Sequence, residues 1–307
     1  MSTTPDYQII LNQIQREFAE QPLSGKVASY IPELVGVPFD KFGMHLHTMA
    51  GEDFCFGDSK DRFSIQSISK VFSLSLAMKV VGEDLWSRVD VEPSGDPFNS
   101  LSQLENEAGI PRNPFINAGA LVVADVLVSS FSNPKAALLT FLHEITGDPT
   151  ITYDETVAAS EKAHGYRNYA LVNYMKSFGN IENEVEEVLD LYFHQCSLAM
   201  SCRELAQAFI IYANQGALLN SEREFLTGQQ VKRINALMQT CGFYDEPIAV
   251  EISTLGGDAE FAGDDRGVTG AAAAVGDDRR RFLHDRLPIG VGHVSHQDVT
   301  RAELCHG

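Results

Sequence analysis

Basic residues are scarce in this chain, which has 23 Lys and Arg against 42 Asp and Glu and a formal net charge of −19. This charge repels polyphosphates and anionic lipid surfaces, which argues against nucleic-acid binding and against a polybasic membrane contact. No run of about 18 apolar residues occurs, so no transmembrane helix is expected. The first residues also lack the basic-then-apolar pattern of a signal peptide.

Cysteine is scarce too, with five residues and no C-x-x-C pair. An odd, scattered set does not form a disulfide framework, and it indicates reduced thiols that pack as small hydrophobes. Together with the missing export signal, this predicts a cytoplasmic protein. The five positions are Cys55, Cys196, Cys202, Cys241 and Cys305.

Apolar residues are plentiful enough for a large core, at 44% of 307 residues. Helical spacing predicts an opening helix over 7–20, and period-2 alternation predicts strands over 43–49 and 54–56. Residues 67–81 are apolar on nearly all sides, which is typical of a buried helix. Two paired strands followed by such a helix indicate an antiparallel sheet with helices packed on it.

The middle of the chain reads as helical after a loop over 92–116 that is rich in Pro, Gly and Asn. Ser201 and Glu204 form an S-x-x-E capping box at the start of one helix. The predicted helices span 117–130, 134–146, 154–164, 167–177, 183–195, 201–215 and 228–240.

An S-x-x-K motif occurs at Ser67–Lys70 and again at Ser132–Lys135. Ser and Lys three residues apart lie on one helix face, and burial at a helix start favours a neutral lysine that can take the serine proton. In the second copy, Pro134 indicates a first helical turn capped by Ser132 or Asn133. Only the first copy opens a strongly apolar helix, where the alternative is a lysine that snorkels to the surface.

His45 and His47 alternate in the predicted strand over 43–49 and could form half of a metal site. No Asp or Cys partner at ligand spacing is evident, so a surface-exposed strand face is the preferred interpretation. His284, His293 and His296 lie in an atypical tail, and no metal site is predicted there either.

A series of sequence blocks follows in a fixed order along the chain: Val27–Leu34, Phe63–Val71, Gly95–Ser100, Pro111–Ala120, Ser160-Glu161 with Arg167-Asn168, Leu191–Ser197 and Cys241–Asp245. Over about residues 8–246 these ordered blocks resemble the serine-dependent glutaminases, which have a β-lactamase-like fold. The resemblance implies hydrolysis of L-glutamine to L-glutamate and ammonia without a metal or organic cofactor.

By this resemblance Ser67 is the nucleophile, Lys70 its general base and Tyr192 a proton relay. Glutamine carries an ammonium, a carboxylate and an amide, for which a carboxylate and side-chain amides are suitable partners. The positions implied to hold substrate are Tyr30, Ser67, Asn117, Glu161, Asn168, Tyr192 and Tyr244.

Each implied position also has a purely structural interpretation. Tyr192 could be a core residue, Tyr244 a turn residue and Asn117 a helix N-cap. Glu161 could lie on a solvated helix face. It is seven residues from Asn168, which places both on one face if the segment is a continuous helix, although Gly165 between them weakens that helix.

The chain departs from the family after Glu246. The family continues with a strand carrying Lys-Ser-Gly-Val, whose valine N–H completes the oxyanion hole, but no Lys-Ser-Gly occurs here. The nearest string is Val268-Thr269-Gly270, among alanine-rich and charged runs. We therefore expect residues from about 247 onward to form none of the family's strands and to be largely disordered or loosely packed, with low or absent glutaminase activity.

The predicted fold is α/β of the β-lactamase/transpeptidase type, with an antiparallel sheet packed on the Ser67 helix and a helical subdomain. The expected division is a sheet domain from 1–94 and 241–307 and a helical subdomain from 95–240. Family members commonly self-associate, so a homo-oligomer (dimer or tetramer) is expected. The rival functions are an impaired homologue that binds glutamine without turnover, and a different S-x-x-K enzyme acting on β-lactams or peptidoglycan.

Overall fold

The computed structural model describes residues 6–20, 27–94, 101–219, 221 and 223–241, and the backbone of 251–253, 268–269 and 271–273. Tyr244, His284, His293 and His296 lie outside these residues. The elements are α1 (Tyr7–Ala19), α2 (Pro32–Val35), β1 (Gly43–Thr48), β2 (Asp53–Gly57), β3 (Phe63–Ser64), η1 (Gln66–Ile68), α3 (Ser69–Val81), η2 (Gly82–Ser87), α4 (Leu101–Asn106), α5 (Asn117–Ser130), α6 (Pro134–Thr146), β4 (Thr152–Tyr153), α7 (Glu155–His164), α8 (Tyr166–Ser177), α9 (Val185–Cys196), β5 (Leu198–Met200), α10 (Cys202–Ala208), α11 (Ile210–Ala213), α12 (Gly228–Cys241), β6 (Glu251–Ser253), β7 (Val268–Thr269) and β8 (Ala271–Ala273).

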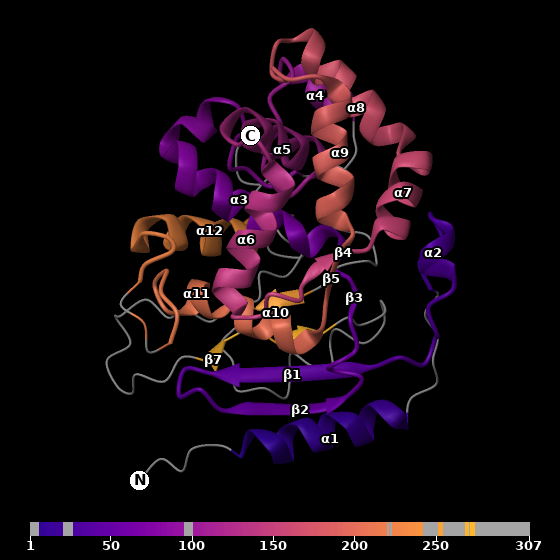
Figure 1. The fold of residues 1–307 in the computed structure, drawn as a ribbon, viewed down its shortest axis with the longest axis vertical. Coiled ribbons are helices and arrows are strands. Elements are labelled where there is room, and N and C mark those ends of the chain that lie inside the picture. The colour runs from indigo at the N-terminus through magenta and orange to yellow at the C-terminus, as the bar shows by residue number, and fades with distance from the viewer. Residues whose placement is uncertain are drawn as a thin grey trace, which may run out of the picture.

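An antiparallel hairpin of β1 and β2 packs on the opening helix α1 at the lower end of the molecule in Figure 1. Alternation along the strands turns Met44, Leu46 and Phe56 toward Leu11 and Ile14 of the helix, and all five are buried in a small core. The predicted helix and both strands are therefore confirmed, and the alternation that identified the strands also supplies the face on which α1 rests.

The opposite face of the hairpin meets α10 rather than the Ser67 helix. The Cys202 thiol at the start of α10 lies 3.7 Å from the Gly43 carbonyl oxygen of β1. The prediction that the sheet packs on the Ser67 helix is therefore not what the structure has. The physical reason is the all-round apolar surface of α3, which needs helices on several sides.

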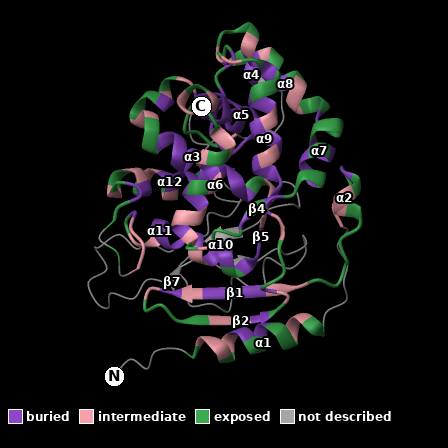
Figure 2. Cartoon of the chain, viewed as in Figure 1, coloured by how far each residue is buried: buried purple, intermediate pink, exposed green. Residues whose placement is uncertain are grey.

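Those helices are α5, α9, α6 and α12, which surround α3 in the upper part of the molecule. Every residue from Ser69 to Met78 is buried, and so is every residue from Ala118 to Leu127 of α5 (Figure 2). A single large core joins these two helices to α6, α8, α9 and α12. It holds the start of α3 in a fixed, desolvated environment.

Short strands form from the segment after residue 247, where the sequence predicted none. β7 pairs antiparallel with β1, so that one sheet has the order β2-β1-β7, and β6 pairs with β8. The sequence pattern indicated neither helix nor strand at residues 251–253, 268–269 and 271–273, whereas the absence of the family's own strands stays a prediction. The alanine-rich run lacks period-2 alternation, which is why side-chain pattern did not reveal a strand held by backbone pairing.

The predicted middle helices are confirmed with shifts of one or two residues, and the S-x-x-E capping box at Ser201 is present. Two predictions need correction. The loop over 92–116 contains the short helix α4, and the helix over 201–215 divides into α10 and α11 at Phe209. No helix in the described part of the chain is long and apolar enough to cross a membrane.

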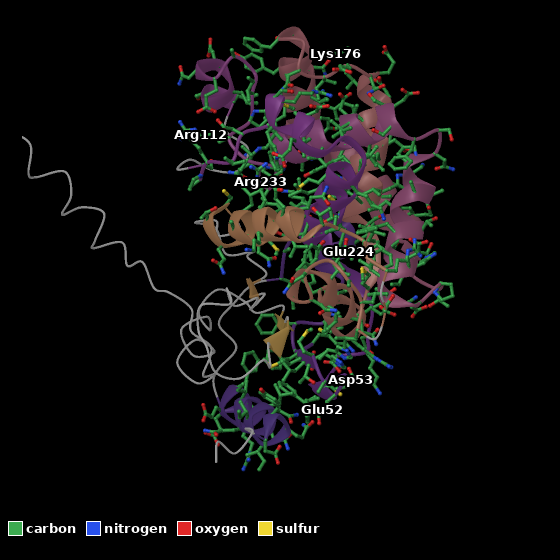
Figure 3. The ribbon with its side chains drawn as sticks, turned by 90° about the vertical axis from the view of Figure 1, so that its left-hand side faces the viewer. Glu52, Asp53, Arg112, Lys176, Glu224 and Arg233 are labelled. Carbon is green, nitrogen blue, oxygen red and sulfur yellow. The ribbon has the colours of Figure 1, made fainter. Side chains whose placement is uncertain are left out.

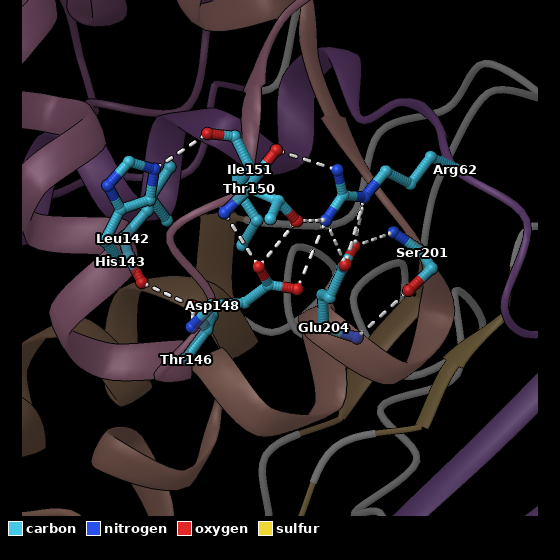
Figure 4. Close-up of polar contacts among 9 residues, drawn as sticks. All are labelled: Arg62, Leu142, His143, Thr146, Asp148, Thr150, Ile151, Ser201 and Glu204. Atoms are coloured by element: carbon cyan, nitrogen blue, oxygen red, sulfur yellow. Dashed lines mark hydrogen bonds and ion pairs between the residues drawn. The ribbon is translucent and has the colours of Figure 1, made fainter.

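A polar network anchors the segment that leads into Ser67 (Figure 4). Arg62 donates to Glu204 at 2.6 Å, to Asp148 at 3.2 Å and to the Thr150 hydroxyl at 2.7 Å. Glu204 in turn accepts from the Ser201 backbone N–H at 2.7 Å. Charge-assisted bonds of this kind are among the stronger ones in proteins, so the network fixes the entry to β3 against α10 and the loop after α6.

Candidate active site

Ser67 lies at the centre of the 3₁₀ turn η1, directly before α3, and its side chain is exposed. Its neighbour Gln66 has a φ of 48°, in the left-handed region that is costly for a residue with a Cβ. Backbone strain of this kind clusters at functional sites. The turn thus presents an accessible hydroxyl directly before a buried helix, which begins at Ser69 rather than at Ser67 as predicted.

Lys70 lies three residues further on and is only 2% exposed. Its Nζ donates to the Phe115 carbonyl and to Asn117 Oδ1, both at 2.8 Å. Burial lowers the pKa of this amine to about 8, against an ordinary value of 10.5. A snorkelling lysine would place its Nζ in water, so that alternative is wrong for this residue.

These acceptors also orient Lys70. A neutral amine has two N–H bonds, which the Phe115 carbonyl and Asn117 Oδ1 can accept, and a lone pair that can take a proton. Lys70 therefore meets the chemical requirements of a general base close to neutral pH.

Asn117 is the first residue of α5, whose N-cap Ile116 makes no side-chain capping bond. The amide of Asn117 instead accepts from Lys70 and donates through Nδ2 to Asn168 Oδ1 at 3.2 Å. The interpretation of Asn117 as an N-cap is therefore wrong. Its side chain links the buried lysine to a second residue of the predicted substrate set.

Glu161 and Asn168 come from two helices, because α7 ends and α8 begins at Gly165. A Cβ on Gly165 would lie 2.5 Å from the Phe193 ring and 2.7 Å from the Glu161 carbonyl oxygen, so only glycine fits this junction. The condition of one continuous helix is not met. Glu161 contacts Tyr30, and Asn168 contacts Asn117.

Glu161 is 6% exposed, which excludes a solvated helix face. Burial raises the pKa of its carboxyl group above the ordinary range, while bonds from Tyr30 and Gln66 oppose this rise. The half-exposed Tyr30 places its hydroxyl 3.0 Å from Glu161 Oε1 and 2.9 Å from Gln66 Oε1. Such a carboxylate is suited to pair with an ammonium that enters from the solvent side.

Tyr192 is buried on α9, 3% exposed, and its ring packs edge-on against Phe193. Its side chain also bonds the thiol of Cys196, which feels the charges of Glu161 and Lys70. Burial raises the pKa of that thiol to about 12, so Cys196 remains protonated and unreactive. Tyr192 thus reaches the same buried region as Lys70, in addition to being a core residue.

Sequence reasoning missed Gln66 and the Phe115 carbonyl. Gln66 lies in the Phe63–Val71 block, directly before Ser67, but a glutamine beside a serine does not by itself indicate a function. A backbone carbonyl acceptor cannot be identified from residue type at all. Both became visible only through the bonds of Tyr30 and Lys70.

The second S-x-x-K copy is structural. Asn133 caps α6 by accepting from the Ala136 backbone N–H at 3.0 Å, with Pro134 in the first turn. Lys135 pairs with Asp190 at 2.7 Å near the surface, and Ser132 is exposed. This copy has the spacing of the first without its burial, which makes it a natural control.

Comparisons with known proteins agree on one family. The family model described as Glutaminase matches residues 25–250. A glutaminase of Christiangramia forsetii is 62% identical over 241 residues, which cover 78% of this chain and 79% of that protein. Among solved structures, the probable glutaminase ybaS has a TM-score of 0.76 and 27% identity, covering 88% of this chain and 89% of its own. A structure titled Mglu in its glutamate form has a TM-score of 0.77 and 26% identity, covering 93% and 68%.

Proposed function

The chain belongs to the glutaminase family, and we propose that it hydrolyses L-glutamine through an acyl-enzyme formed on Ser67. The Ser67 oxygen attacks the side-chain amide carbon while Lys70 takes the hydroxyl proton. Lys70 then passes a proton to the leaving nitrogen, which departs as ammonia and leaves a glutamyl ester. Water activated by the same amine cleaves the ester, releases L-glutamate and restores the serine.

The observation that carries this proposal is the environment of Lys70. A lysine that is 2% exposed, bonded to two oxygen acceptors and lowered in pKa to about 8 has no obvious structural purpose. Perturbed titratable groups of this kind concentrate at catalytic sites. The accessible serine one turn before it supplies the nucleophile.

Substrate recognition follows from the charges around that pair. Glu161 pairs with the α-ammonium of glutamine, and Tyr30 positions the carboxylate of Glu161 through its hydroxyl. The amides of Asn117 and Asn168 serve the polar groups of the substrate. Tyr192 relays protons. Tyr244, which lies outside the described residues, is included among the substrate-binding residues because of the resemblance to the family.

The residues after about 247 affect the expected rate of hydrolysis. The family match ends at residue 250, and the Lys-Ser-Gly-Val strand that supplies the second oxyanion donor is missing. Loss of one such donor lowers rates about 10² to 10³-fold in other enzymes. We therefore expect slow hydrolysis, and this same observation favours the second candidate, a homologue that binds glutamine without turnover.

The test is release of ammonia and glutamate from L-glutamine by the unmodified chain. Cleavage of a chromogenic β-lactam, assayed separately, tests the rival activity. We expect slow release from glutamine and no β-lactam cleavage. A hybrid with a family-like segment carrying Lys-Ser-Gly-Val in place of residues 247–307 should release ammonia about 10² to 10³-fold faster. Glutamine binding without release in both proteins would instead establish the second candidate, and β-lactam cleavage would contradict the proposal.

Three further properties belong to the proposal. We infer a homo-oligomer, a dimer or tetramer, and a cytoplasmic location, which agrees with the free state of Cys55, Cys196, Cys202 and Cys241 in the described part of the chain. The division of the chain into two parts also stays a prediction: a sheet domain over 1–94 with 241–307, and a helical subdomain over 95–240. Light scattering of the purified chain tests self-association directly.

A further inference from the structure

A second cluster of chemically active side chains lies on the β1–β2 hairpin, among residues that the Ser67 site does not use. His45 and His47 project from the same face of β1, and Asp53 of β2 stands opposite His47 in the register. Asp53 Oδ1 lies 2.7 Å from His45 Nε2 and 2.8 Å from His47 Nδ1. One carboxylate oxygen therefore contacts two imidazole nitrogens at hydrogen-bond distance.

This arrangement corrects the sequence interpretation of the two histidines. The side chain of His45 is 2% exposed and that of His47 12%, so they do not form a surface face. The missing acidic partner is Asp53, which strand pairing brings to them across the turn. Separation along the chain concealed it, because ligand spacing within one segment says nothing about a neighbouring strand.

The cluster is packed on both faces of the hairpin and reaches solvent at Asp53. Met44, Leu46 and Phe56 occupy the face toward α1, so the histidines lie on the opposite face, which meets α10. The side chain of Asp53 is 39% exposed. Figure 3 shows Asp53 beside Glu52 at the hairpin end of the molecule, far from Lys176 at the helical end. An ion could therefore enter from the Asp53 side.

The residue types of the cluster are those of metal ligands. Metal ions bind neutral imidazole and ionised carboxylate, which two histidines and one aspartate can supply.

We propose that His45 Nε2, His47 Nδ1 and Asp53 Oδ1 form a binding site for a divalent transition metal of the zinc class. The three candidate ligand atoms lie within 4.8 Å of one another. Two imidazoles and one carboxylate are a donor set that zinc accepts, with water in the remaining position. Ligand atoms at about 2.1 Å from a tetrahedral ion are about 3.4 Å apart, so both His–Asp contacts must open by roughly 0.6 to 0.7 Å.

The consequence of binding is mechanical rather than catalytic. The ion would fasten β1 to β2 beside the turn and thereby hold the hairpin that β7 extends. The net charge of −19 favours a cation. His45 Nδ1 is buried and has no hydrogen-bond partner among the described residues. Ligating histidines normally donate through their second nitrogen, so we expect an affinity about 10 to 100-fold below that of a fully supported site.

The test is titration of the metal-free full chain with Zn²⁺, and with Co²⁺ as a spectroscopic probe. We expect one saturable ion per chain and a rise in the melting temperature, since an ion that binds only the folded state stabilises it. Asp53→Asn keeps the shape and an acceptor oxygen, and His47→Gln keeps a polar side chain. Each should weaken Zn²⁺ binding at least tenfold.

The matched control is His164→Asn, which removes an exposed histidine whose Nδ1 lies 2.9 Å from the Ser160 carbonyl oxygen. It should leave Zn²⁺ binding unchanged. Absence of saturable binding, or unchanged affinity in both Asp53→Asn and His47→Gln, would overturn the proposal. Ammonia release by metal-free Asp53→Asn should match that of the unmodified chain, which separates this inference from the proposed function.

Discussion

Replacing Lys70 by Met removes the charge of a buried amine while keeping the length of the side chain. Burial lowers the pKa of Lys70 from 10.5 to about 8 in the folded protein. At about 1.4 kcal/mol for each pH unit, this corresponds to a cost of about 3 kcal/mol for folding with the lysine protonated. The magnitude is a large fraction of the stability of an ordinary domain.

The pH dependence of this cost has a definite sign. Between about pH 8 and 10.5 the unfolded chain binds the Lys70 proton while the folded chain has lost it. The free energy of unfolding therefore rises with pH in this window, and the contribution is constant below pH 8, where both states hold the proton. Lys70→Met lacks the group, so the stability of the unmodified chain relative to the variant should rise by about 3 kcal/mol from about pH 8 to 10.5.

The assay is urea unfolding at several pH values, followed by circular dichroism and by fluorescence of the single tryptophan, Trp86. The quantity compared is the difference in the free energy of unfolding between the unmodified chain and the variant. Contributions from other groups that titrate in the same pH range cancel in this difference. Lys79→Met, on the exposed side of the same helix, is the matched control, because it replaces a lysine by methionine without removing a buried amine. A difference for Lys70→Met that stays flat with pH would refute the reasoning.

The remaining predictions concern the same site and its support. Lys70→Arg should reduce ammonia release as severely as Lys70→Ala, because a guanidinium cannot act as a base, and an active arginine variant would remove Lys70 from the mechanism. Tyr30→Phe should raise KM for glutamine about tenfold with little change in kcat, since it removes the hydroxyl bond to Glu161; a fall in kcat alone would contradict this role. Arg62→Ala should lower the free energy of unfolding by about 1 to 3 kcal/mol, measured by urea denaturation, because Glu204 loses its charged partner; unchanged stability would show the network to be dispensable.

Much of the helical part was predictable because its signals are local. Capping residues, Pro134 and helical periodicity placed α5, α6 and α12 within one residue, and also the start of α10. Burial of Lys70 could also be predicted, since it sits inside an apolar helix. Local signals say nothing about which element covers which, so the contact of the hairpin with α10 could not be foreseen.

Non-local pairing explains the other differences. Asp53 reaches the two histidines of β1 only across the hairpin, and Glu161 meets Tyr30 from 131 positions away in the chain. The strands β7 and β8 form in a segment without alternation, because backbone bonds to a neighbouring strand need no side-chain pattern. Contacts of this kind depend on the complete fold rather than on any window of sequence.

The central claim is that Ser67 is the nucleophile of glutamine hydrolysis, and ammonia release by matched serine variants tests it most directly. Ser67→Ala should abolish the release from L-glutamine that the unmodified chain shows. Ser132→Ala, which alters the exposed serine of the second S-x-x-K copy, should leave it unchanged. Release by Ser67→Ala at the rate of the unmodified chain would contradict the acyl-enzyme mechanism and the assignment of this site.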